Sequence, residues 1–198
     1  MQEQVQQAGS GSFFRTLSGR FLLLTLVFVM LAEVLIFVPS IARFRADFLL
    51  EKLKQAQIAA LVQLASDEMI SPELEAELLR NAEVFNVVLR RDDVRQLVLS
   101  SPVPKPIEDD FDLRTAGPWA LIKDAIKVMI TPEDRIIRVI GNPVQEGGQL
   151  IEVTLSTKPL RKAMLVYAGR ILGISVLISA VTARALPRRT ISTSRASP

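Results

Sequence analysis

Residues 21–42 read FLLLTLVFVMLAEVLIFVPSIA, and Glu33 is the only ionisable side chain among them. A helix of about 20 apolar residues crosses the ~30 Å hydrocarbon core of a bilayer. A cleaved signal peptide is the alternative, but the apolar run from Phe21 to Val38 is longer than the roughly 7–15 residues of a signal-peptide core. The stretch therefore predicts an uncleaved transmembrane helix over 21–42.

A second apolar stretch, MLVYAGRILGISVLISAVTA, occupies residues 164–183, and Arg170 is its one charged residue. It is rich in small residues, which let membrane helices pack closely. These are Gly169, Gly173, Ser175 and Ser179. Two transmembrane helices divide the chain into an N-terminal segment 1–20, a domain over 43–163 and a tail over 184–198, with both termini on one side.

The distribution of Lys and Arg predicts the orientation. The tail carries four arginines and no acid, and the segment 1–20 has Arg15 and Arg20 against Glu3. The domain over 43–163 has 17 basic and 19 acidic residues, a net charge of −2. Both termini are therefore expected in the cytoplasm, and the chain is expected to be a multi-pass protein of a bacterial inner membrane, with the lipid bilayer as a partner.

The 198-residue chain contains no cysteine and no histidine. These absences exclude disulfides, thiolate metal sites and phosphohistidine chemistry on this chain. A net charge of +3 without a basic stripe gives no reason to expect nucleic acid as a partner. No cofactor or metal is expected. A cysteine-free exported domain suits a bacterial periplasm, because it needs no oxidative folding.

Residues 43–65 continue the first apolar stretch without a glycine or proline and predict a long N-terminal stalk helix. Five apolar residues recur along it at spacings of 4, 3, 4 and 4, which places them on one helix face. They are Leu49, Leu53, Ala56, Ala60 and Leu64. Arg45 is expected off this stripe. The spacing is close to the 3.5 average of a coiled-coil seam and predicts a homodimer seam. Packing on the chain's own sheet is the alternative.

Two further helices are predicted in the domain. Ser71-Pro72-Glu73 combines an N-cap, a first-turn proline and an acid at the positive end of the helix dipole. Pro118 opens the second helix, whose apolar stripe includes Trp119, Ile122 and Met129. This stripe is expected in the core.

Four strands are predicted from β-branched and apolar runs. They cover residues 84–90, 94–99, 135–140 and 149–156. Strands in two pairs, together with the helices, predict an α+β domain with an antiparallel sheet. The segment 101–110 is expected to be an extended acidic loop. Its carboxylates, Glu108, Asp109 and Asp110, together with Asp112, are candidates for a divalent cation, but their spacing does not match an EF-hand. A solvated loop is the simpler interpretation.

The order of apolar stretch, stalk, α/β domain and apolar stretch resembles the N-terminal sensor half of an alphaproteobacterial two-component sensor histidine kinase. The resemblance covers about residues 13–183 and includes FLLLTLVFVMLAEVLIFVPSIARFRADF and the RVIGNP of residues 138–143. It implies a PAS-like periplasmic domain, parallel dimers and an unknown periplasmic ligand or protein. Family members continue into a HAMP relay and a kinase core, so the chain resembles a kinase truncated before them.

No autophosphorylation is expected, since the chain has no histidine and no glycine-rich nucleotide loop. The function expected from these features is a membrane-bound signal-input module. The alternative is a membrane scaffold or assembly protein. Ligand-dependent displacement of the membrane helices would favour the first, and unchanged helices with a stable partner would favour the second.

Glu33 and Arg170 are the charges within the two apolar stretches, and intramembrane charges mark functional sites by default. Counted from the outer ends of the two stretches, both lie in the outer half of the bilayer and form a candidate pair, within one subunit or across a dimer. In the alternative interpretation Arg170 snorkels outward and Glu33 is protonated.

Overall fold

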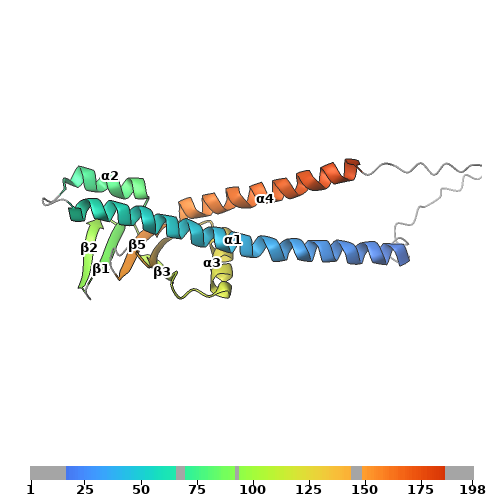
Figure 1. Ribbon diagram of the computed structural model, residues 1–198, viewed down its shortest axis with the longest axis horizontal. Helices are drawn as coiled ribbons and strands as arrows, with labels where there is room; N and C mark the ends of the chain where they lie inside the picture. Colours follow the sequence, from blue (N-terminus) through green and yellow to red (C-terminus); the bar gives the residue numbers. More distant parts are fainter. Residues whose placement is uncertain (1–16, 66–69, 92–93, 144–148, 186–198) are drawn as a thin grey trace, which may run out of the picture.

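The computed structural model describes residues 17–65, 70–91, 94–143 and 149–185. The expected terminal segments 1–20 and 184–198 lie almost entirely outside these residues. The elements follow in the order α1 (Leu17–Ala65), α2 (Pro72–Ala82), β1 (Asn86–Arg91), β2 (Val94–Ser100), β3 (Ile107–Asp112), α3 (Pro118–Ile130), β4 (Ile136–Gly141), β5 (Leu150–Ser156) and α4 (Thr157–Ala185). The expected α+β class is confirmed, and Figure 1 shows one domain from which parts of α1 and α4 project in the same direction.

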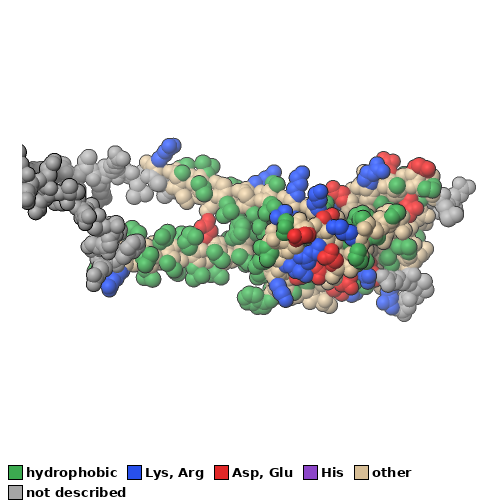
Figure 2. Space-filling model, turned by 180° about the vertical axis from the view of Figure 1, so that it is seen from behind, with side chains coloured by type: hydrophobic (Ala, Val, Ile, Leu, Met, Phe, Trp, Pro, Cys, Tyr) green, Lys and Arg blue, Asp and Glu red, His purple; other side chains and the backbone are tan. Residues whose placement is uncertain are grey.

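The predicted long N-terminal helix is confirmed, because α1 is a single helix of 49 residues that continues through Pro39. It joins the first apolar stretch to the stalk without a break. Helix α4 follows strand β5 directly, with Thr157 next to Ser156. Both helices are long and apolar enough to cross a membrane. Their projecting parts are covered with exposed apolar side chains, whereas charged side chains gather over the domain (Figure 2).

The sheet has five strands in the order β2-β1-β5-β4-β3. Three of its pairings are antiparallel, and β3 pairs with β4 in parallel. The prediction of an antiparallel sheet is therefore wrong at this edge. Helix α3 lies between β3 and β4 in the chain, and a parallel pair needs such a crossover because the chain must return to the end where it started.

Strand β3 lies where an acidic loop was expected. A run of carboxylates forms an edge strand here because cations on neighbouring elements neutralise it. Asp110 is the register partner of Arg138 on β4, and the two form an ion pair of 3.5 Å. Phe111, between two acids, turns into the core. The alternation of one buried apolar residue with paired acids gives the strand its inner and outer face.

Helix α1 packs across one face of the sheet and supplies much of the core. The buried strand residues that face it alternate along each strand, as in a sheet with one packed and one solvated face. They include Val87, Leu89, Val139, Ile151 and Val153. On the α1 side, Leu49, Leu53, Ala56 and Ala60 are buried in the same core. Helix α2 lies along the far end of α1 (Figure 1).

The predicted helices at Pro72 and Pro118 are confirmed, and Ser71 caps α2 by accepting a hydrogen bond from the Leu74 amide. The burial expected for the Trp119 stripe is wrong for the tryptophan itself, which is 82% exposed. Helix α3 buries the face centred on Ala125. At 3.6 residues per turn, this face lies about a third of a turn away from Trp119.

Candidate functional site

A cavity of the domain lies where α1, β3, α3 and β4 meet. We name it the Arg45 cavity after the residue that α1 contributes. Its walls also include Phe111, Asp124, Val128, Ile137 and Thr157. The volume is about 70 Å³. One water occupies roughly 10–15 Å³ on this measure, so the cavity has room for about five water-sized groups.

Arg45 is a charged residue in the interior of the protein. It is only 3% exposed, and its Nε and Nη1 atoms have no hydrogen-bond partner within the described chain. The guanidinium carbon lies 4.1 Å from the ring centroid of Phe111, a cation–π contact. Burial lowers the pKa of Arg45 to about 10, while the negative charges of Asp124 and Asp109 offset part of this effect. Arg45 therefore stays charged at neutral pH.

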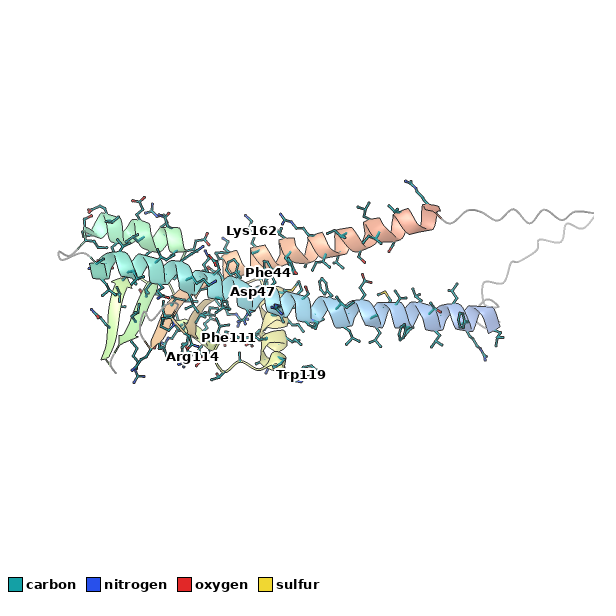
Figure 3. The ribbon with its side chains drawn as sticks, in the orientation of Figure 1. Phe44, Asp47, Phe111, Arg114, Trp119 and Lys162 are labelled. Carbon is teal, nitrogen blue, oxygen red and sulfur yellow. The ribbon has the colours of Figure 1, made fainter. Side chains whose placement is uncertain are left out.

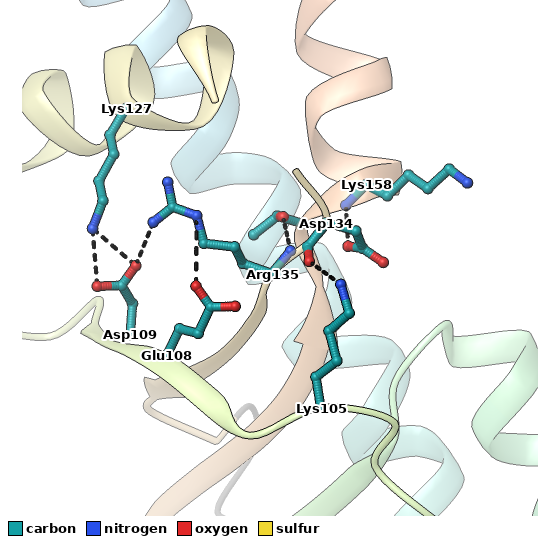
Figure 4. Close-up of polar contacts among 8 residues, drawn as sticks. Lys105, Glu108, Asp109, Lys127, Asp134, Arg135 and Lys158 are labelled. Carbon is teal, nitrogen blue, oxygen red and sulfur yellow. Dashed lines mark hydrogen bonds and ion pairs between the residues drawn. The ribbon is translucent and has the colours of Figure 1, made fainter. Parts of the chain in front are cut away.

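The carboxylates of β3 next to the cavity are paired with cations (Figure 4). Asp109 accepts hydrogen bonds from Lys127 at 2.9 Å and from Arg135 at 3.1 Å. The hydrogen bond from Lys127 is the largest cause that holds the pKa of Asp109 below its usual value, and Arg135 adds to it. Glu108 lies 3.8 Å from Arg135. The carboxylate of Asp109 is therefore paired with Lys127 and Arg135, and it forms no direct ion pair with Arg45.

The acidic cluster of β3 does not have the geometry of a metal site. Asp112 is held by Arg114 at 2.7 Å, as Asp110 is by Arg138. In the described ranges no group of three or more acidic side chains is arranged to hold a metal ion. The chemistry of this edge is that of an ion-pair network. Among the described residues, the buried side-chain donors without a hydrogen-bond partner are those of Arg45 on α1, beside this edge.

Helices α1 and α4 meet at an aromatic contact beside the first apolar stretch. The rings of Phe44 and Tyr167 stack with centroids 4.3 Å apart and an interplanar angle of 12°. The hydroxyls of Tyr167 and Ser40 share a hydrogen bond of 2.9 Å. This contact sets the level of α4 against α1: Tyr167 lies beside Ser40 and Phe44.

Glu33 and Arg170 do not pair within the described chain. Glu33 instead accepts a hydrogen bond of 2.6 Å from Ser175 on α4. Ser175 lies five residues beyond Arg170, which corresponds to about 7.5 Å along a helix. Arg170 is exposed and lines a surface groove with Phe44, Phe48 and Lys162. The two charges therefore lie at different levels, a separation that counting from the ends of the two stretches could not give.

The predicted dimer seam is occupied by the chain's own core. Leu49, Leu53, Ala56 and Ala60 are buried against the sheet, and Leu64 is partly exposed. This is the alternative that the spacing left open. Arg45, which was expected off the stripe, lies on it: it precedes Leu49 by four residues and so continues the same spacing. That continuation was the available signal for its burial, and sequence reasoning missed it.

No family model, no curated protein and no solved structure matches the chain. The class of the molecule therefore rests on its own residues. It is an α+β domain with a mixed five-stranded sheet, joined to two helices that are long and apolar enough to cross a membrane.

Proposed function

We propose that the chain is the membrane-bound signal-input module of a two-component sensor histidine kinase. In this proposal α1 and α4 cross the inner membrane of a bacterium, both termini lie in the cytoplasm, and the domain between them is a PAS-like periplasmic sensor. Phosphotransfer belongs to another part of the system, since the chain has no histidine. Reporter fusions at Lys105 and at the C-terminus test the topology, because they should report opposite compartments.

One observation carries the proposal: the Arg45 cavity is lined by residues of both apolar helices, at the points where these helices join the domain. Arg45 belongs to α1, and Thr157, the first residue of α4, lines the same cavity. A molecule that enters the cavity therefore bears on both helices at once. A ligand shifts an equilibrium only through its different affinity for the two states, and the unpartnered Nε and Nη1 of Arg45 offer donors that a bound oxygen acceptor would use.

The ligand class follows from the size and the donors of the cavity. Space for about five water-sized groups limits the occupant to a small molecule or a small part of a larger one. An oxygen acceptor of the ligand would pair with Arg45. Asp124 and Glu133 on the walls of the cavity favour a ligand that also carries a hydrogen-bond donor or a positive charge. These features support a small polar molecule that carries both kinds of group.

Filling the cavity tests the coupling without knowledge of the ligand. Val128→Phe places extra volume in the Arg45 cavity, and Leu97→Phe adds volume at an exposed site of β2 that does not line the cavity, as a control. Spin labels at cysteines introduced at Leu24 and Val181 report the separation of the two helices. Because helix shifts in switching proteins are about 1–2 Å, we expect a change of that size for Val128→Phe alone. Unchanged distances would favour a membrane scaffold.

A homodimer remains part of the proposal, on a different face of α1. Outside the core, α1 exposes further apolar side chains. They are Leu50, Ile58, Leu61 and Val62, of which Ile58 is 64% exposed and lines a groove with Leu78 and Ala82 of α2. Cysteines at Leu50 and Ile58 should crosslink between two chains, and cysteines at the buried Leu49 and Leu53 should not. The reverse pattern would place the seam on the face first predicted.

A further inference from the structure

Helix α3 exposes an apolar face that the domain does not use. Trp119 is 82% exposed, Ile130 is 73% exposed and Ile126 is 45% exposed. Their spacings of seven and four residues place them on one side of the helix. The opposite side is anchored, because Ala125 is buried and Leu121 and Ile122 pack against the core. The exposed face is therefore held rigidly by the fold.

The level of α3 along α1 is set by the cavity they share. Asp124 and Val128 of α3 face Arg45 across it. Arg45 lies seven residues beyond Val38, where the first apolar run ends, and three residues beyond Ala42, where the predicted span ends, which correspond to about 10 Å and about 5 Å of helix. A helix with its side chains has a radius of about 5–6 Å. The membrane-facing side of α3 would thus lie between the hydrocarbon surface and about 5 Å above it, in reach of a headgroup layer about 5–7 Å thick.

The orientation of α3 fits the same surface. Figure 1 shows α3 running across α1 instead of along it, and so roughly parallel to a membrane that α1 would cross. Figure 3 places Trp119 on the side of the domain from which the apolar parts of α1 and α4 extend. Lys123 on α3 and Arg43 on α1 are exposed at this level. Tryptophan and basic side chains are the residues that membrane interfaces favour.

We propose that α3 rests on the outer surface of the bilayer, with Trp119, Ile126 and Ile130 in the headgroup region. The occupant of the exposed face is the lipid surface, in continuity with the apolar belt of α1, and the exposed cations match anionic headgroups. This proposal rests on the membrane placement of α1 and α4 given above, but not on a signalling role. Its consequence is that a shift of α3 against the lipid would move one wall of the Arg45 cavity.

The chain carries its own probe, because Trp119 is its single tryptophan. The full chain is reconstituted into phosphatidylcholine vesicles, with and without phosphatidylglycerol, and flotation after alkaline wash first checks that it is membrane-inserted. Tryptophan fluorescence is then quenched by acrylamide from water and by brominated lipids from the bilayer. The matched control combines Trp119→Phe with Leu97→Trp, which moves the probe to a site on β2 that is 57% exposed. Strand β2 lies at the end of the domain opposite the projecting parts of α1 and α4 (Figure 1).

We expect brominated lipid to quench Trp119 but not the Leu97→Trp control. Acrylamide quenching of Trp119 should be roughly threefold weaker than in the control, as expected for a ring withdrawn into the interface. The pair Ile126→Ser and Ile130→Ser should raise acrylamide quenching of Trp119, and Leu97→Ser, at a comparably exposed site on β2, should not.

Two results would overturn the proposal while membrane insertion stands. In the first, the chain floats but Trp119 is as accessible to acrylamide as the control. In the second, Trp119 is shielded from acrylamide but insensitive to brominated lipid, so that a second copy of the chain or another protein covers it. A chain that does not float at all removes the membrane placement itself, which is a separate failure.

Discussion

Replacing Arg45 with methionine should stabilise the domain. Burial lowers the pKa of Arg45 to about 10, and at ~1.4 kcal/mol per pKa unit this corresponds to a penalty of about 3 kcal/mol for the charged side chain. The lowered pKa means that the penalty is fully present below about pH 10, and so at neutral pH. The cation–π contact with Phe111 offsets about 0.5–2 kcal/mol of it.

Methionine has a similar length, no charge and no unpaired donor, and it packs well against an aromatic ring. We therefore expect Arg45→Met to raise the free energy of unfolding by about 1–3 kcal/mol. The assay is urea unfolding of the full chain in a nonionic detergent, followed by circular dichroism and by the fluorescence of Trp119. Arg43→Met, at an exposed position two residues away, is the control and should change stability by less than about 0.5 kcal/mol.

A loss of about 1 kcal/mol or more in Arg45→Met would refute the reasoning, because it would mean that the arginine holds the fold together and is not an unsatisfied group kept at a cost. The same variants link stability to binding. A small molecule that pairs with Nε and Nη1 should raise the melting temperature of the wild-type chain and leave that of Arg45→Met unchanged, since only binding to the folded state stabilises it.

Three further predictions concern the surroundings of this site. Asp109→Asn should remove part of the acid sensitivity of the domain. The depressed pKa of Asp109 stabilises the fold at neutral pH, and this stabilisation is lost as the pH falls below about 4. Melting curves between about pH 3 and pH 7 measure the loss. Tyr167→Phe keeps the ring stack but loses the hydrogen bond to Ser40, so unfolding should become easier by about 0.5–1.5 kcal/mol. Gly141→Ala should cost about 1–3 kcal/mol in the same unfolding assay, because the new Cβ would lie 2.5 Å from Cδ1 of the buried Leu53.

Local patterns were enough to predict most elements of the fold. The Ser71 cap and the proline at the start of α3 act within one turn, so the sequence next to them determines the structure. The long apolar run and the stalk that follows it merge into α1 because nothing between them stops a helix except Pro39, which α1 accommodates. The β-branched runs became β1, β2, β4 and β5 within a residue or two of their expected ends.

The failures have a common cause, which is that they depend on partners distant in the sequence. Strand β3 is acidic and reads as a loop until Arg138 and Lys127 are brought beside it. Its parallel pairing follows from the crossover through α3, not from its own residues. Within one chain, Glu33 does not meet Arg170, because the register of α1 against α4 brings Ser175 to it. A pair across a dimer stays a prediction. Such registers are set by packing and cannot be counted from one strand or helix.

The candidate site was hidden for a related reason. An arginine next to an apolar stretch normally indicates a membrane boundary, where long basic side chains reach out to water and headgroups. Arg45 lies four residues before Leu49, so the helical period turns it inward, and the core that encloses it is built by β3 and α3 from residues more than 60 positions later. The same period leaves Trp119 outside. A buried arginine and an exposed tryptophan on elements that share one cavity are the opposite of what a soluble domain prefers. Both are explained if the plane through Arg45 and α3 is where the domain meets the lipid. The unpartnered donors of Arg45 can there bind a small polar molecule, and the indole of Trp119 is there in the environment that it favours.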